Sequence, residues 1–191
     1  MALRYSATMR PRQTLPALWL LSDARNDAML EEAMRRLPRG SGVVFRHYHL
    51  PGPDRRARFA RLARLCRQRE HWLVLAGTAE EARRSRALAS YGPPSAGPRL
   101  RLATAHSLRE IGRANRTGAA LVLLSPVFPT RSHPGAPHLG PLRFLLLARR
   151  ALCPVVALGG MDHRRARQLP GYGWAAIDGL SHKSRGYRRD S

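Results

Sequence analysis

The sequence has a single lysine, Lys183, only two cysteines, and 12 acidic residues against 34 basic ones. Its positive charge therefore comes from 33 arginines, and the formal net charge is +22. The cysteines, Cys66 and Cys153, lie far apart in the sequence and form neither a metal-ligand motif nor a redox motif. We expect both thiols to be reduced in a cytoplasmic protein.

Long apolar segments are also absent. No uncharged run reaches the length of a membrane span, and residues 1–12 lack the apolar core of a signal peptide. We therefore expect a soluble protein without a membrane partner. A chain of 191 residues fits one domain. We place that domain at residues 15–181, after a flexible basic arm (1–14) and before a disordered basic tail (182–191).

The arginines allow two interpretations. Guanidinium groups bind phosphate and release counterions, which would indicate a nucleic-acid partner. Alternatively, the arginines cover solvated faces of helices. They recur every three or four residues inside predicted helices and form no block with interleaved aromatic residues. We favour the second interpretation and expect no nucleic-acid partner, but keep nucleic-acid binding as the third of three functional alternatives.

Short apolar runs alternate along the chain with segments whose apolar residues recur at helical spacing. The segment that begins at Asp54, for example, has apolar residues on one face and arginines on the other. The expected strands are residues 15–23, 42–50, 71–76, 100–105, 121–130, 154–161 and 173–178. Such regular alternation is typical of a parallel α/β fold.

The weakest region is residues 90–98, Ser-Tyr-Gly-Pro-Pro-Ser-Ala-Gly-Pro, where a fourth strand is due. Proline and glycine favour a loop, with at most a short, edge-like strand. A doubly wound sheet would normally show a glycine-rich phosphate turn after its first strand, whereas here the glycines come late. We therefore predict a (β/α)8 TIM barrel that is short, since such barrels have about 250 residues, with a weak fourth βα unit.

The stretch 121–161 contains the residues best suited to an anion. Thr130 and Ser132 follow one apolar run, and Gly159 and Gly160 follow the next. Bare glycine backbone lets N–H groups approach a phosphate, and the start of the following helix adds a favourable dipole. Gly179, after the last strand, offers a second approach. The glycine pair could instead form only a tight strand-to-helix turn.

The same stretch resembles a known family. Pro126-Val-Phe-Pro-Thr-Arg-Ser-His133, then Leu139-Gly140, then Pro154-Val-Val-Ala-Leu-Gly-Gly-Met161 are similar to the signature of the thiamine phosphate synthase and TenI family. The resemblance implies a (β/α)8 barrel that joins a pyrimidine pyrophosphate to thiazole phosphate and releases pyrophosphate. It also implies that the loops with Gly159, Gly160 and Gly179 hold the thiazole phosphate.

The residues that would bind the pyrophosphate differ from the pattern of that family. Of the family's Gln-x-Arg-x-Lys only Arg46 is present, Thr104 replaces a serine, and His133 replaces a lysine; the resemblance makes these three the catalytic candidates. The family's Mg²⁺ carboxylates have no counterpart, because Ala76 and Gly77 stand at one position and no aspartate lies near the fourth strand. Asp178 replaces a serine and would repel phosphate.

The histidines add no metal site in this reading. His47 and His49 alternate along one segment, but no cysteine or carboxylate accompanies them in the sequence, so we expect no metal there. His106 could act as a general base, although a structural hydrogen bond is the more common role. The leading functional hypothesis is therefore a thiamine phosphate synthase, and the alternative is a degenerate barrel that binds a phosphorylated small molecule without catalysis. The sequence does not indicate an oligomeric state.

Overall fold

Eight parallel strands close into a barrel in sequence order, with β1 hydrogen-bonded to both β2 and β8. The computed structural model describes residues 15–93, 100–132 and 134–180. The predicted arm (1–14), the predicted tail (182–191) and His133 lie outside the described residues. The strands are β1 (Leu18–Leu21), β2 (Gly42–Phe45), β3 (Trp72–Ala76), β4 (Ala89–Gly92), β5 (Arg101–Ala105), β6 (Leu121–Leu124), β7 (Val155–Leu158) and β8 (Gly173–Ala176).

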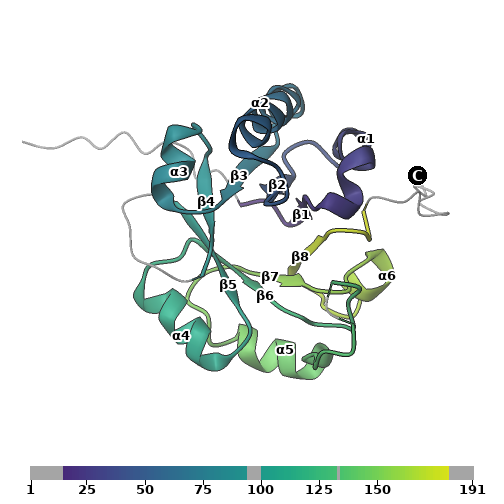
Figure 1. The fold of residues 1–191 in the computed structure, drawn as a ribbon. Coiled ribbons are helices and arrows are strands. Elements are labelled where there is room, and N and C mark those ends of the chain that lie inside the picture. The colour runs from purple at the N-terminus through teal and green to yellow at the C-terminus, as the bar shows by residue number, and fades with distance from the viewer. Residues whose placement is uncertain (1–14, 94–99, 133, 181–191) are drawn as a thin grey trace, which may run out of the picture.

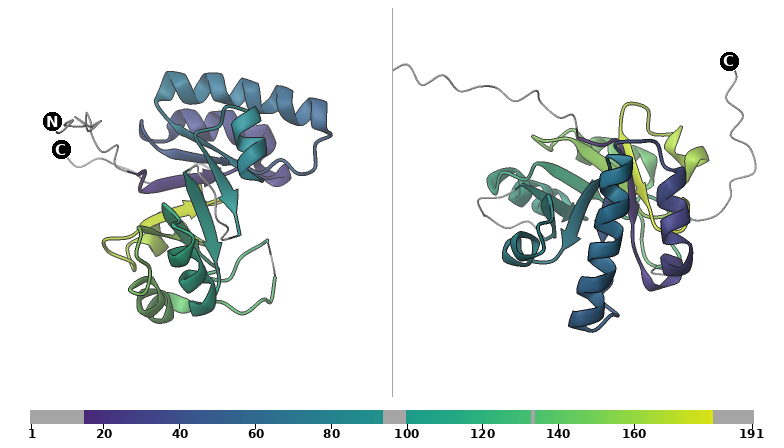
Figure 2. Two further views of the ribbon diagram at one scale, coloured as in Figure 1. Left: turned by 90° about the vertical axis from the view of Figure 1, so that its left-hand side faces the viewer. Right: turned by 90° about the horizontal axis from the view of Figure 1, so that it is seen from above.

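The helices lie around the outside of this barrel (Figure 1). They are η1 (Ala24–Met29), α1 (Leu30–Arg36), α2 (Gly52–Arg69), α3 (Ala79–Arg84), α4 (Leu108–Arg116), α5 (Gly140–Ala148) and α6 (His163–Ala166). Several begin where the sequence supplies a cap: the side chain of Thr78 accepts from the N–H of Glu81, and that of Ser107 from the N–H of Glu110. Figure 2 shows α1 and α2 side by side on one flank.

Side chains alternate between the inside and the outside of the barrel along each strand. In β1, Trp19 and Leu21 point into the barrel core, whereas Leu20 packs with the helices outside. The indole of Trp19 fills the space beside β2, where a Cβ on Gly42 would lie 2.1 Å from its ring. Gly42 is therefore required by packing, and the alternation explains why the apolar strand runs are nearly continuous.

The fourth strand corrects one expectation. β4 pairs in parallel with both β3 and β5, so it is an interior strand of the closed barrel and not an edge-like one. The strand occupies Ala89–Gly92 and ends just before Pro93, so the prolines that argued against it come after the strand in the sequence. Residues 94–99, between β4 and β5, lie outside the described residues.

Candidate functional site

A cavity of about 680 Å³ opens at the carboxyl ends of the strands, where barrel enzymes have their active sites. Residues that follow five strands converge on it: β2, β4, β5, β6 and β7, with the segment after β8 closing the ring. Its size is that of a small-molecule site. The lining includes Arg46, Tyr48, Tyr91, Thr104, His106, Thr130, Arg131, Ser132, Gly159, Gly160, Asp162, Arg165, Asp178 and Gly179.

The cavity brings together the site residues predicted from the sequence. Arg46 and Thr104 lie at one side of it, and the residues proposed for phosphate lie at the other. The predicted phosphate residues that line it are Thr130, Ser132, Gly159, Gly160 and Gly179. His133 is the one predicted site residue that lies outside the described part of the chain. Segments separated by up to 133 residues in the sequence thus meet because the barrel closes.

Gly159 and Gly160 form a turn that only glycine fits. Both have positive φ, 96° and 62°. A Cβ on Gly159 would lie 2.7 Å from Cα of Pro126, and one on Gly160 would lie 2.3 Å from the carbonyl oxygen of Pro129. The tight-turn interpretation is therefore correct as far as it goes. The N–H groups of both glycines have no hydrogen-bond acceptor among the described residues, so they can still donate to a ligand.

Two arginines that the sequence analysis did not single out lie beside the residues predicted to bind phosphate. Arg165 lines the cavity, donates to the carbonyl oxygen of Gly160, and places its guanidinium 5.1 Å from the ring centre of Phe128. Arg25 follows β1 and reaches Ser132, with 2.8 Å between Nη2 and Oγ. Arg165 could have been found from its position five residues after Gly160. Arg25 could not, because only barrel closure brings β1 beside β8.

Asp178 is less unfavourable for an anion than its charge implies. Its Oδ2 lies 3.5 Å from Nη1 of Arg25, whose Nε also pairs with Asp23 at 2.9 Å, so Arg25 offsets part of the charge of Asp178 at the edge of the cavity. The predicted helix dipole, by contrast, contributes little. Helix α6 has only four residues, and the side chain of Asp162 already caps it by accepting from the N–H of Arg165 at 2.8 Å. Backbone N–H groups and arginines, rather than a helix, give this side its preference for anions.

The other side of the cavity has fewer cations. Nη2 of Arg46 lies 3.8 Å from Oδ2 of Asp23. Burial acts to raise the pKa of Asp23, but Arg25 and Arg46 hold it below its usual value, so this carboxylate offsets part of the Arg46 charge. Tyr48 stands where the family has a lysine and lines the cavity without charge. Burial raises the pKa of Tyr91 to about 12, so its phenol is neutral as well.

Known proteins are similar to this chain both in sequence and in fold. The family model of thiamine monophosphate synthase (TMP-TENI) matches residues 97–181, which include β5 to β8 and the Gly159–Gly160 turn. "Putative thiamine-phosphate synthase 2" of Aquifex aeolicus (strain VF5) is 35% identical over 78 residues, or 41% of this chain and 42% of that protein. Residues 97–181 are therefore similar to the TenI family. The matched part spans 42% of the curated relative's length.

Solved structures share the fold of this chain. Thiamine phosphate pyrophosphorylase from Pyrococcus furiosus superposes with a TM-score of 0.74 at 21% identity, over 88% of this chain and 89% of that one. FabK from Thermotoga maritima gives a TM-score of 0.62 at 14% identity, over 87% of this chain and 59% of its own. The barrel fold is therefore shared with these two proteins.

The described residues do not fit the Mg²⁺ site that the TenI family implies. Mg²⁺ prefers oxygen ligands, usually one or two carboxylates together with substrate phosphate. Ala76 is buried at the end of β3, and the N–H of Gly77 bonds the carbonyl of Tyr91. The carboxylates among the described lining residues are Asp162 and Asp178, both on the phosphate side. The carboxylate of Asp23 lies beside Arg46, but it pairs with Arg25 and Arg46 and does not line the cavity.

His106 has the structural hydrogen bond expected of it and also lines the cavity. Its Nδ1 lies 2.8 Å from the carbonyl oxygen of Ser125, so the neutral ring donates there. In that tautomer Nε2 is the acceptor nitrogen. A structural role for Nδ1 and a ligand contact for Nε2 are therefore compatible.

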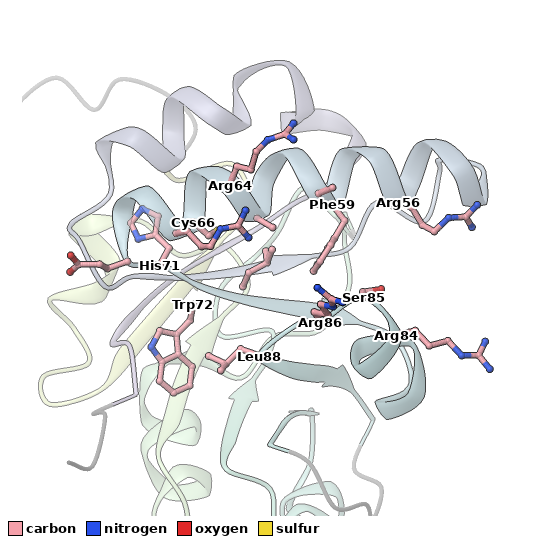
Figure 3. A pocket seen from close by; sticks show the side chains of 15 residues that line it. Arg56, Phe59, Arg64, Cys66, His71, Trp72, Arg84, Ser85, Arg86 and Leu88 are labelled. Atoms are coloured by element: carbon pink, nitrogen blue, oxygen red, sulfur yellow. The ribbon is translucent and has the colours of Figure 1, made fainter. Parts of the chain in front are cut away.

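A second hollow, of about 810 Å³, lies on the outer surface between α2 and α3 (Figure 3). Phe59, Trp72 and Leu88 form its apolar floor, and Arg56 and Arg84 extend outward from its rim. It lies at the amino end of β3, away from the carboxyl ends where barrel chemistry takes place. We therefore assign the candidate site to the smaller cavity.

None of the helices in the described parts of the chain is long and apolar enough to cross a bilayer.

Proposed function

We propose that this chain is a thiamine phosphate synthase-like protein that joins hydroxymethylpyrimidine pyrophosphate to thiazole phosphate. The observation that supports the proposal most is the turn at Gly159 and Gly160. One part of the cavity is bordered by the N–H groups of these two glycines, which have no acceptor among the described residues, by the Arg165 guanidinium and by the hydroxyls of Thr130 and Ser132. Backbone N–H groups and arginine together are typical of phosphate sites.

The remaining volume of the cavity lies toward Arg46 and Thr104, where the pyrimidine pyrophosphate would bind. The family reaction ionises the C–O bond to pyrophosphate, so the departing oxygen gains negative charge that must be stabilised. In this chain the Arg46 guanidinium would donate to that charge, with the Thr104 hydroxyl beside it. The neutral phenol of Tyr91 can donate a further hydrogen bond.

A coupled assay for thiamine phosphate, run with and without Mg²⁺, tests the proposal. We expect slow product formation that requires both substrates and that falls when Arg46 is replaced by alanine. Arg56→Ala is a suitable control, because Arg56 lies on the outer surface by the second hollow. Absence of product under all conditions would exclude synthase activity. Strong dependence of product formation on Mg²⁺ would contradict the conclusion that the described residues do not fit a Mg²⁺ site.

A specific observation also supports the alternative, a barrel that binds a phosphorylated small molecule without catalysis. The pyrophosphate side has one arginine, Arg46, partly offset by Asp23, and none of the described residues that line this side is a carboxylate. Calorimetry with thiazole phosphate separates the two candidates. Binding without turnover supports the alternative, and absence of binding contradicts both.

A further inference from the structure

Residues 46–49, which follow β2, direct their side chains to two sides. Arg46 and Tyr48 line the cavity. His47 and His49 lie on the opposite side, with 5.1 Å between their ring centres. Asp27 of η1 meets them there, with 2.8 Å between its Oδ1 and Nε2 of His47. The expectation that no carboxylate accompanies these histidines is therefore wrong: one comes from 20 residues earlier in the chain.

The geometry of this cluster is close to that of a metal site. One ligand atom from each of Asp27, His47 and His49 can be chosen so that all three lie within 4.8 Å of one another. A tetrahedral zinc ion, with bonds of about 2.0–2.2 Å, holds its ligand atoms ~3.3 Å apart. A metal bound by His47 and the Asp27 carboxylate would replace the contact that now joins Nε2 of His47 to Oδ1 of Asp27 at 2.8 Å. His49 is exposed on a turn, so its ring can move inward.

The groups around the cluster also suit a metal ligand. Nδ1 of His47 lies 2.7 Å from Oγ of Ser22, whose oxygen also accepts from the N–H of Arg46 at 2.8 Å. A histidine that binds a metal through one nitrogen usually donates from the other to such a partner. Ser22 and His47 are both fully buried, so the imidazole is held in one orientation.

One neighbour opposes a cation. Arg58 donates to Oδ1 of Asp27 from Nε at 3.0 Å and from Nη2 at 2.7 Å. Its charge is shared with Glu31, which accepts from Nη1 at 2.5 Å. Every hydrogen bond of the Asp27 carboxylate within the described chain goes to Oδ1. Oδ2 is therefore available to a metal while Oδ1 keeps its bond to Arg58.

We propose that Asp27, His47 and His49 bind a divalent transition-metal ion, zinc foremost, with water as the fourth ligand. Two imidazoles and one carboxylate select zinc and its neighbours over Mg²⁺, which prefers an all-oxygen site. The site lies outside the substrate cavity and does not depend on the proposed function. Its effect would be structural: it would fix residues 46–49 and so the segment that presents Arg46 to the cavity.

Titration of the metal-free, full-length protein with ZnCl₂ in a calorimeter tests the proposal. We expect one zinc ion per chain in the wild type. His49→Ala should weaken binding by more than the about 10–100-fold that loss of an outer partner costs. His49 makes no hydrogen bond in the described structure, so its removal should leave the fold intact. The control is His138→Ala, an exposed histidine outside the cluster, which should bind zinc like the wild type.

Two further readouts keep the test independent of activity. Cobalt(II) in a site with two histidines and one carboxylate should give visible absorption bands in the wild type and the control, but not in His49→Ala. Zinc should raise the melting temperature of the same two proteins, because a ligand that binds only the folded state stabilises it. Equal zinc affinity in the wild type and His49→Ala, or no stoichiometric binding in the wild type, would overturn the proposal.

Discussion

Replacing Arg165 by alanine should weaken the binding of thiazole phosphate without unfolding the protein. Its guanidinium donates to the carbonyl oxygen of Gly160, and the ligand phosphate is proposed to accept from the N–H of the same residue. The two charges would therefore lie about 6 Å apart. At an effective dielectric constant of about 20, that separation corresponds to about 2.8 kcal/mol per unit charge.

Salt screening at the open mouth of the cavity reduces this value, and we take about 1.5–2 kcal/mol as the expected loss. That loss corresponds to an affinity about 10–30-fold lower. Calorimetry with thiazole phosphate measures it directly. Arg164→Ala is the matched control, because Arg164 is the neighbouring residue on α6, is exposed, and does not line the cavity.

Arg165→Lys should retain part of the affinity, since it keeps the charge but loses the planar fork of donors. Equal affinity in wild type and Arg165→Ala would refute the reasoning and place the phosphate elsewhere. Substitution of Gly160 is a poorer test, although it lies at the same turn. A Cβ there would meet the carbonyl oxygen of Pro129 in a left-handed backbone conformation, so loss of binding could reflect loss of the turn.

Three further predictions concern the rest of the barrel. Gly42→Ala should lower the free energy of unfolding by about 1–3 kcal/mol in urea titrations, because its Cβ would overlap the buried Trp19 ring. Burial raises the pKa of Cys66 to about 12, so a disulfide reagent should modify half-buried Cys153 in the native protein and Cys66 only after unfolding. Burial lowers the pKa of His71 below 6.5, so as pH decreases the unfolded state binds a proton at this residue before the folded state does. The free energy of unfolding should therefore be full above pH 6.5 and fall as pH decreases through the lower folded pKa, and His71→Gln should reduce that fall.

Each of these has a clear contrary result. Gly92→Ala is the control for Gly42, because a Cβ there has no atom within 4 Å; equal destabilisation of the two variants would contradict the packing argument. Equal labelling rates for both thiols in native protein would contradict the burial of Cys66. The same pH dependence of unfolding in wild type and His71→Gln would show that another group is responsible. Glutamine can keep the hydrogen bond to the carbonyl of Met34, so that comparison isolates the charge.

The sequence was enough to predict the barrel. Alternating apolar runs indicated a parallel α/β fold, and the late glycines and the family resemblance favoured the closed barrel that is observed. The residues predicted at the ends of β6 and β7 do line one cavity. The misses were of a different kind. The fourth strand was obscured because Pro93 follows it immediately and local propensity does not register pairing with both β3 and β5.

Contacts made by chain closure could not be read from sequence spacing. Arg25 meets Asp178 because η1 follows β1, which lies beside β8 in the barrel. Asp27 meets His47 for a similar reason, since η1 packs beside the segment that leaves β2. In both cases two side chains share a site through neighbouring strands, and sequence separation carries no information on that proximity.

The unequal distribution of charge between the two sides of the cavity has a consequence for the order of binding. The turn at Gly159 and Gly160 offers N–H donors and Arg165 without a metal, so a monophosphate can bind there unaided. A pyrophosphate beside Arg46 carries more charge but meets one guanidinium already shared with Asp23. Its binding therefore costs more desolvation per favourable contact. We infer that thiazole phosphate affinity should exceed pyrophosphate affinity in this chain, and the converse order in calorimetry would contradict the assignment of the two sides.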